Sequence, residues 1–348
     1  MLQWLNEPAA QTSSRAQEAA EARQASLTKP VGSLGVLEDI AIKFAGWQGS
    51  SKPELSNVSL RIFAADHGVA TEGVSAFPQE VTAQMIGNFL SGGAAVSVLA
   101  RKLNASFSVV NLGTATPLDD AENLHNLQLA AGSHNFCEQA SLGDELLEKC
   151  LEAGRQFGAE EDCQLFVAGE MGIGNTTSAS AICSAALTLP VEQSVGRGTG
   201  ITDSVLEQKQ KVVRTGLDKH RTSIRTPLGI LSHVGGLEIA AMVGAYISAA
   251  QKGVPILVDG YICSSAALIA CQINPSIRNW MLFAHRSTEP GHQHILTKMD
   301  AKPLFDLGLR LGEGSGAALA IPFIQHALAL HNEMATFREA AVTAGKNY

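Results

Sequence analysis

Aromatic and charged residues are scarce in this sequence of 348 residues. Phe, Trp and Tyr make up 5% of it and Asp, Glu, Lys and Arg 17%, whereas hydrophobic residues reach 45%. A chain with so few charges and so many apolar residues can bury a large core, which excludes an intrinsically disordered protein. Small residues are abundant, with 33 glycines, so the composition favours close packing of helices on strands over a β-sandwich.

Runs of basic residues are also absent. The formal net charge is −8, from 25 Lys and Arg against 33 Asp and Glu. An acidic chain without a basic run is a poor candidate for binding nucleic acid. An anionic small molecule is not excluded, because a few positive side chains act strongly at short range. Lys29, Lys209, Arg286 and Arg310 are the candidates for that role.

The six cysteines form no CxxC pair, and the first residues do not resemble a signal peptide. No run approaches the roughly 18 apolar residues that a membrane-spanning helix requires. We therefore expect a cytoplasmic protein with reduced cysteines and no membrane span.

Apolar, β-rich runs alternate with helical patterns along the middle of the chain, and most of the runs end in Gly, Asp, Glu or His. This order predicts an α/β fold, a Rossmann-like parallel sheet with helices on both faces. Ligands bind such sheets outside the carboxyl ends of the strands. The expected strands are 58–65, 106–112, 164–168, 255–258 and 280–284, and the expected helices are 81–103, 143–156, 177–188, 205–220, 237–251 and 264–272.

Both ends of the chain have helical patterns. A capping box from Ser14 to Gln17 opens a helix that runs to about Leu27, and a second helix is expected over 36–47. The last segment, 306–340, is helical after a glycine break at 312–316. We expect a large α/β domain over 54–298, and a small helical domain that combines 1–53 with 299–348.

The segment GEMGIGNTT (169–177) follows an expected strand and opens a helix. Free N–H groups at a helix start, with glycines that allow close approach, are typical of a phosphate site. The segment matches neither the Walker A motif nor the dinucleotide fingerprint, and a plain glycine-rich turn remains an alternative. Glu170 would repel a phosphate, but it could face a sugar hydroxyl or a developing cation.

Glu313 lies between Gly312 and Gly314, ahead of an Ala-rich apolar helix. A carboxylate in such a loop is a candidate general base, since burial would raise its pKa, whereas a helix N-terminus would lower it. A helix-capping carboxylate is the structural alternative.

Other segments give weaker signals. The loop GRGTG (196–200) precedes Lys209 on an expected helix, and 73–85 could wall a flat aromatic ligand. His285, His292 and His294 could hold zinc with Glu289, but the spacing is not HExxH. The strand-end pair Asp66-His67 favours a structural or substrate-facing role, and Asp119-Asp120 is not typical of a diphosphate–magnesium motif.

Taken together, these segments resemble one family, the nicotinate-nucleotide:dimethylbenzimidazole phosphoribosyltransferases of cobalamin nucleotide-loop assembly. The matching blocks occur in order over nearly the whole chain, and the ordered set is specific although each block is weak. They are KPVGSLG (29–35), ADHGV (65–69), FPQEVT (77–82), GEMGIGNTT (169–177), VDG (258–260) with SAAL (265–268), and LRLGEGSGAA (309–318).

The resemblance implies a homodimer that converts nicotinate mononucleotide and a benzimidazole base into α-ribazole 5′-phosphate and nicotinate, without metal or cofactor. It implies that Glu313 is the catalytic glutamate and that Glu170 and Lys209 belong to the active site. Residues of the matching blocks would bind the substrates: Gly172, Gly174, Asn175 and Thr176 at the phosphate and ribose, Phe77, Pro78, Gln84 and Met85 at the base, and Gly314, Ser315 and Gly316 beside the glutamate.

The expected chemistry is attack of one imidazole nitrogen on C1′ while Glu313 removes the proton from the other nitrogen. Three rival readings stay open. A dinucleotide-dependent oxidoreductase would bind NAD, and a non-catalytic protein would bind nicotinate mononucleotide without releasing nicotinate. A variant transferase would use a purine or a phenol as acceptor.

Overall fold

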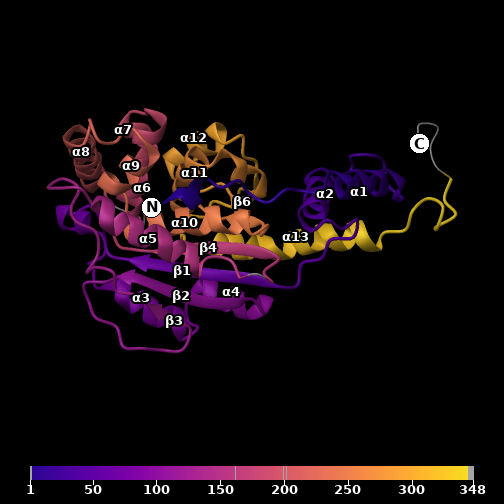
Figure 1. Ribbon diagram of the computed structural model, residues 1–348, viewed down its shortest axis with the longest axis horizontal. Helices are drawn as coiled ribbons and strands as arrows, with labels where there is room; N and C mark the ends of the chain where they lie inside the picture. The colour runs from indigo at the N-terminus through magenta and orange to yellow at the C-terminus, as the bar shows by residue number, and fades with distance from the viewer. Residues whose placement is uncertain (1, 161, 199, 201, 344–348) are drawn as a thin grey trace.

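A seven-stranded, entirely parallel sheet forms the centre of the protein (Figure 1). The computed structural model describes residues 2–160, 162–198, 200 and 202–343. The strands lie in the order β3-β2-β1-β4-β5-β6-β7. Their bounds are β1 Val58–Ala65, β2 Ser106–Gly113, β3 Leu124–Asn126, β4 Leu165–Met171, β5 Ile256–Val258, β6 Met281–His285 and β7 Pro303–Phe305.

The strand order reverses between β1 and β4. The chain moves outward from β1 to β3, and then returns to place β4 on the other side of β1. Open α/β sheets bind ligands at such a switch point, beyond the carboxyl ends of the strands. The predicted Rossmann-like α/β sheet is thus confirmed, with β3 and β7 as two short edge strands that the sequence did not indicate.

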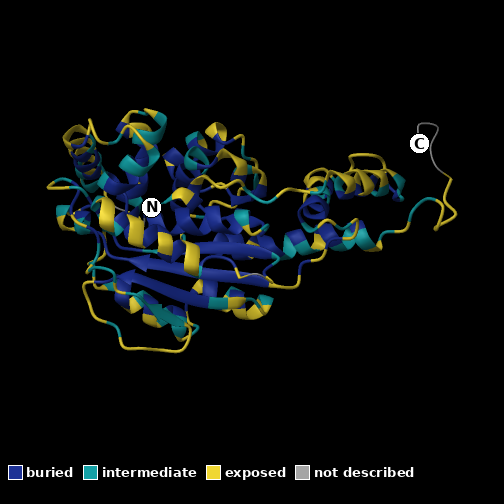
Figure 2. Cartoon of the chain, in the orientation of Figure 1, coloured by how far each residue is buried: buried dark blue, intermediate teal, exposed yellow. Residues whose placement is uncertain are grey.

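Helices cover both faces of the sheet, so its strands are buried as Figure 2 shows. One face carries α10 and α11, with α5 packed on α10, and the other carries α3, α4 and α13. The longer helices are α3 Val81–Leu90, α4 Ala95–Leu103, α5 Gly143–Phe157, α6 Asn175–Leu187, α8 Asp203–Lys219, α9 Pro227–Val234, α10 Leu237–Gln251, α11 Tyr261–Ile273, α12 Pro290–Lys298 and α13 Ser315–Glu333, with the single-turn α7 at Val191–Ser194.

The helices α1 (Ser14–Ser26) and α2 (Val36–Gln48) pack on each other and on α13, beyond the end of the sheet (Figure 1). Arg23 ties α1 to the end of α13, because its Nε donates to the carbonyl of His331 at 2.6 Å. Segments from both termini therefore lie together. The predicted division at residue 298 stays a prediction, since β7 and the contacts of α13 with β6 run across it.

Local differences from the expected elements have simple causes. The side chain that caps α1 is Ser13, which accepts from the N–H of Ala16, and not Ser14. The expected helix 81–103 is two helices, because Gly92 takes a φ of +82° between α3 and α4. By length and composition, Val81–Leu103 could cross a membrane, contrary to our expectation that no segment would. A single segment of this kind is weak evidence for a membrane span. Its two helices, α3 and α4, pack against the sheet and against each other, as helices of a protein core do.

Candidate active site

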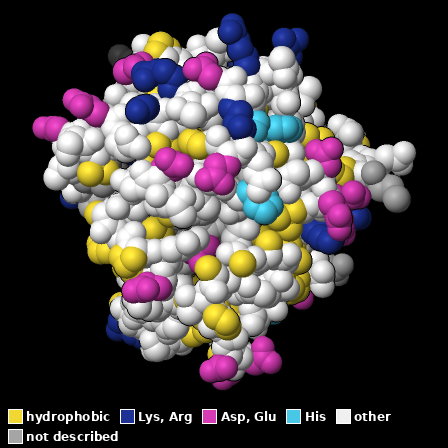
Figure 3. Space-filling view, turned by 90° about the vertical axis from the view of Figure 1, so that its left-hand side faces the viewer, with side chains coloured by type: hydrophobic (Ala, Val, Ile, Leu, Met, Phe, Trp, Pro, Cys, Tyr) yellow, Lys and Arg dark blue, Asp and Glu magenta, His cyan; other side chains and the backbone are white. Residues whose placement is uncertain are grey.

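A cavity of about 380 Å³ lies at the carboxyl edge of the sheet, at the ends of β4, β5 and β6. Figure 3 views the molecule from the side toward which the strands point, where hydrophobic, acidic and histidine side chains are exposed near the middle. The loop 310–313, the start of α6 and the segment 77–85 complete the walls. The lining residues are Phe77, Val81, Met85, Glu170, Met171, Gly172, Ile173, Asn175, Thr176, Gly198, Asp259, Gly260, Tyr261, Ile262, Cys263, His285, Ser287, Glu289, Arg310, Leu311, Gly312 and Glu313.

Glu313 lies in a strained turn at the cavity wall. Its φ is +64°, between values of +85° at Gly312 and +76° at Gly314. Such angles suit glycine, and a glutamate persists there only when neighbouring groups hold it. The turn also packs closely on β4, since a Cβ added to Gly169 would lie 2.5 Å from the carbonyl oxygen of Glu313.

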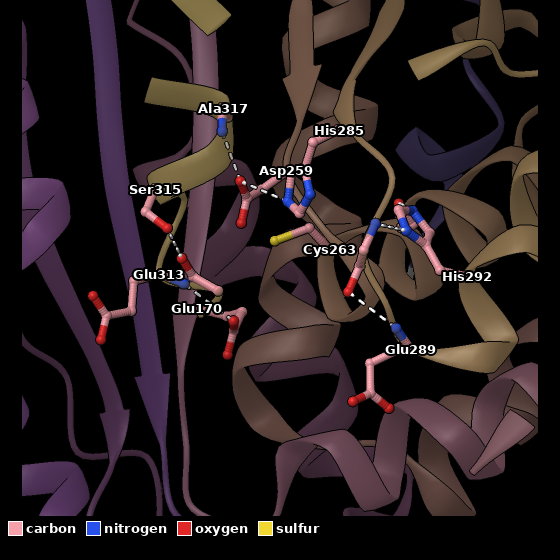
Figure 4. Close-up of polar contacts among 12 residues, drawn as sticks. Glu170, Asp259, Cys263, His285, Glu289, His292, Glu313, Ser315 and Ala317 are labelled. Carbon is pink, nitrogen blue, oxygen red and sulfur yellow. Dashed lines mark hydrogen bonds and ion pairs between the residues drawn. The ribbon is translucent and has the colours of Figure 1, made fainter. Parts of the chain in front are cut away.

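Hydrogen bonds hold this turn from two sides. The N–H of Glu313 donates to Oε1 of Glu170 at 3.3 Å, and the Ser315 hydroxyl donates to the carbonyl of Gly312 at 2.6 Å. Asp259, which follows β5, accepts from the N–H of Ala317 at 2.7 Å. In Figure 4 the Glu313 side chain points away from Asp259 and His285. Glu313 is 8% exposed and is one of the residues that line the cavity.

Burial changes the proton affinity of both glutamates. It raises the pKa of Glu313 to about 7, and the negative charge of Asp259 adds to the rise. Burial also raises the pKa of Glu170 well above its ordinary value, although the hydrogen bonds from the N–H of Glu313 and the amide of Asn175 lower it. Glu313 is therefore able to accept a proton near neutral pH, which is the property of an efficient general base.

The predicted anion loop forms the amino end of α6. Gly174 takes a φ of +97° at the N-cap, and the Asn175 amide donates to Glu170. Ile173 is fixed from α3, because its N–H donates to the Thr82 hydroxyl at 3.1 Å. The start of a helix favours a phosphate. Gly172, Asn175 and Thr176 line the cavity, whereas Gly174 does not.

Lys209 lies behind this loop, and it does not line the cavity. Its side chain is almost fully buried, and its Nζ donates to the Thr176 hydroxyl at 2.9 Å and to the Gly196 carbonyl at 3.4 Å. Burial lowers its pKa to about 8, against the attraction of Glu289. Arg310 reaches the same corner, where its Nη1 lies 3.4 Å from the Gly198 carbonyl oxygen. The positive groups thus gather beside Thr176.

The segment 77–85 contributes an apolar wall, as the sequence indicated. Phe77 and Met85 line the cavity, together with Val81 and Leu311, which the sequence analysis did not select. Pro78 and Gln84 are exposed and lie outside the lining. Three further residues that we selected, Gly314, Ser315 and Gly316, shape the start of α13 and also lie outside it. These five residues would therefore meet a substrate only outside the lining of this cavity.

Sequence reasoning gave no substrate-site role to the wall made by β5 and β6, although it included Asp259 in a matching block and considered His285 as a zinc ligand. Asp259, Tyr261 and His285 all line the cavity. The signal that could have found them is their position, because Asp259 and His285 end or directly follow strands, where ligand-binding residues gather. His285 Nε2 lies 3.7 Å from Asp259 Oδ1 (Figure 4).

The histidines of the segment 285–294 have separate partners. His292 bonds to the Ser264 hydroxyl at 2.9 Å and accepts from the N–H of Ser287 at 2.8 Å. Within the described residues, no three His, Cys, Asp or Glu side chains gather as a metal site. Of the other candidate cations, Lys29 pairs with Glu38 and Arg286 with Asp306, and neither lines the cavity.

His67 is a structural support beneath the anion loop. Its Nε2 lies 2.7 Å from Glu238 Oε1 and its Nδ1 3.0 Å from the Ser178 hydroxyl, and both the histidine and the glutamate are fully buried. A Cβ on Gly172 would lie 3.1 Å from the His67 ring. The pair Asp66-His67 therefore faces the interior, in line with the structural alternative.

A parallel sheet with a glycine-rich helix start, an apolar wall and a buried carboxylate at one cavity is typical of an enzyme for phosphorylated substrates. The family model described as phosphoribosyltransferase matches residues 9–342. The chain belongs to this phosphoribosyltransferase family.

Named relatives agree with that assignment. The chain is 51% identical over 342 residues to the nicotinate-nucleotide–dimethylbenzimidazole phosphoribosyltransferase of Pseudomonas putida, with 97% of each chain covered. It is 51% identical over 345 residues to the Pseudomonas aeruginosa protein of the same name, with 98% of each covered. The crystal structure of the Thermus thermophilus enzyme of that name has a TM-score of 0.90 at 39% identity, and the match covers 96% of this chain and 100% of that one.

Proposed function

We propose that the protein transfers the 5-phosphoribosyl group of nicotinate mononucleotide to 5,6-dimethylbenzimidazole. The products are α-ribazole 5′-phosphate and nicotinate, and the reaction belongs to the assembly of the cobalamin nucleotide loop. The names of the relatives, at about half identity over nearly the full length, support this substrate pair. The observation that carries the chemistry is Glu313, a cavity-lining carboxylate with a pKa of about 7.

In the proposed mechanism one imidazole nitrogen of the acceptor attacks C1′ of the ribose. The bond from C1′ to the nicotinate nitrogen breaks, and its electron pair neutralises the pyridinium ring, so no acid is needed for the leaving group. Glu313 takes the proton from the other imidazole nitrogen. Attack from the face opposite nicotinate inverts the β linkage to α. A placed general base is worth roughly 10²–10⁴ in rate, and the alignment of the two rings contributes further.

The proposed positions of the substrates follow the charges of the cavity. The phosphate lies at the amino end of α6, near Thr176, with Lys209 and Arg310 at the same corner. The acceptor ring lies against Phe77, Val81 and Met85, within reach of Glu313. Positive charge that develops at C1′ then faces Glu170, whose oxygens are held by Asn175 and the N–H of Glu313. This chemistry calls for no metal or cofactor.

We also propose a cytoplasmic homodimer. Phe77, Leu307 and Leu311 are large apolar side chains that are 49%, 60% and 57% exposed, and two of them line the cavity. Exposed apolar groups around a site are typical of a surface that another protein covers. All six cysteines are free thiols, which suits a reducing compartment.

The test is release of nicotinate by the purified protein from nicotinate mononucleotide in the presence of single acceptor bases. We expect release with 5,6-dimethylbenzimidazole, together with a ribazole phosphate of α configuration. A panel with a purine and a phenol separates the base preference from the reaction class. Binding of nicotinate mononucleotide without release for any acceptor would contradict the transferase assignment, and hydride exchange with NAD would indicate an oxidoreductase.

A further inference from the structure

Asp259 caps α13 from a different element. It follows β5, and its Oδ1 accepts from the N–H of Ala317 at 2.7 Å. Ala317 lies in the first turn of α13, where backbone N–H groups have no partner within the helix. The N-cap residue is Gly314, which has no side chain to do this. Asp259 therefore holds the end of α13 that directly follows Glu313.

The segment held in this way is under strain. Gly312, Glu313 and Gly314 take left-handed angles one after another, and a glutamate in that region needs support from its surroundings. Glu170 provides this support by accepting from the N–H of Glu313, and Asp259 provides it one turn later by accepting from the N–H of Ala317. Loss of either contact should loosen the direction of the Glu313 side chain.

Capping alone does not explain why residue 259 is charged. Its Oδ2 is buried and has no hydrogen-bond partner within the described residues. The ring of His285 is 3.7 Å from Oδ1, which is beyond a hydrogen bond. A buried carboxylate oxygen without a partner is costly. An asparagine could accept the same N–H, but it would bury an unpartnered amide group in place of Oδ2. What the carboxylate adds to the cap is its negative charge, which the N–H groups of Gly314 and Gly260 favour.

We propose that Asp259 is a positioning residue for the transfer reaction, which fixes the turn that carries Glu313 by holding the start of α13 and whose negative charge disfavours the ionised form of Glu313. The proposal rests on the proposed function, in which Glu313 is the base. It agrees with the pKa of Glu313, which burial and then Asp259 raise to about 7. Burial opposes the charge on Asp259, and His285 with nearby N–H groups favours it. The other charged or titratable groups that line the cavity are Glu170, Tyr261, Cys263, His285, Glu289 and Arg310.

Two variants separate the two parts of this role. Asp259→Asn retains an acceptor for Ala317 and removes the charge, so the pKa of Glu313 should fall. We therefore expect the acid limb of the pH profile, the low-pH side on which kcat/KM for nicotinate release declines, to move to lower pH by on the order of one pH unit. Asp259→Ala removes the acceptor as well, so we expect a further loss of kcat of roughly tenfold or more with KM for nicotinate mononucleotide nearly unchanged.

Asp66→Asn is the matched control. Asp66 follows β1, is buried, accepts one backbone N–H from Ala115 at 2.8 Å, and has one oxygen without a partner. It is not among the groups that shift the pKa of Glu313. We expect D66N to lose stability in the same way as D259N while the acid limb stays in place.

An acid limb in folded D259N at the wild-type position would overturn the proposal. If D259N does not fold, Asp259→Ser offers a smaller oxygen acceptor, and the same comparison applies to it. Glu313→Gln separates this failure from failure of the proposed function. If E313Q keeps both turnover and the limb, Glu313 is not the base. If E313Q loses them while D259N does not shift the limb, only the role of Asp259 is wrong.

Discussion

Replacement of Glu313 by Gln tests the proposed chemistry most directly, because it keeps the shape of the side chain and removes the proton acceptor. We expect kcat for nicotinate release to fall by roughly 10²–10⁴, the usual worth of a general base. That loss corresponds to about 2.7–5.5 kcal/mol in the activation free energy. Both substrates should still bind, since the anion loop and the apolar wall are unchanged.

The same substitution should stabilise the folded protein at alkaline pH. The pKa of Glu313 rises from 4.5 to about 7 on folding, so between these values the folded state holds a proton that the unfolded state has lost. Stability therefore falls as pH rises through this window, and the full penalty applies above pH 7. The shift corresponds to about 3 kcal/mol, reduced to about 2–3 kcal/mol because the carboxylate faces an open cavity. E313Q removes that penalty.

The assay combines activity with thermal melting. At pH 8 the melting midpoint of E313Q should exceed that of the wild type by about 3–4 °C, for a chain of this length, and near pH 4.5 the two should agree. Glu122→Gln, at an exposed position, should change neither quantity. Wild-type turnover in E313Q with both substrates bound would refute the assignment of the base, and equal midpoints at pH 8 would refute the buried, proton-retaining carboxylate.

The anion corner offers further predictions. Lys209→Met keeps the buried aliphatic part of the side chain and removes the charge. KM for nicotinate mononucleotide should rise about tenfold or more, because a charged hydrogen bond is lost. A KM within twofold of the wild-type value would place the phosphate elsewhere. Gly172→Ala adds a Cβ that would lie 2.4 Å from the Ala65 carbonyl oxygen. We expect the free energy of unfolding in urea to fall by about 1–3 kcal/mol and nicotinate mononucleotide to bind more weakly. A fully active, stable variant would contradict this expectation. Thr82→Val removes the acceptor of the Ile173 N–H and should lower kcat/KM about two- to tenfold, whereas Thr71→Val, which changes a surface hydroxyl outside the cavity, should not.

The fold was predictable where strands are long and apolar on both faces. All eight positions of β1 are buried, and its run of Val, Leu, Ile, Phe and Ala residues marks it clearly. The edge strands β3 and β7 have three residues each, which are only partly buried. A run of three residues is too short to show the alternating hydrophobic pattern of a strand. It becomes a strand because the neighbouring strand offers backbone N–H and C=O groups for hydrogen bonds. Helix α12, which begins at Pro290, was also not predicted.

Part of the candidate site was predictable because its loops carry unusual residues. The glycines around Glu313 and after Glu170 indicate backbone angles or close contacts that other residues avoid. The contribution of Lys209 through Thr176 was not predictable in this form, because a side chain behind a loop has the same sequence pattern as one in the cavity. Asp259 shows no local pattern beyond its place after a strand, and its bond to Ala317 joins residues that are far apart in the sequence.

An acidic protein that binds a phosphorylated substrate must bring positive groups close to the phosphate, and this cavity has two of them at one corner. The positive groups Lys209 and Arg310 meet at Thr176 and Gly198, beside the amino end of α6. Glu170 and Glu313 are joined through a backbone N–H, and Glu170 also accepts from the Asn175 amide at this end of α6. Nicotinate mononucleotide has a phosphate at one end of its ribose and a cationic ring at C1′, so this arrangement would orient it before any reaction. Glu313, a cavity-lining carboxylate with a pKa of about 7, is then the group that we propose takes the proton from the acceptor.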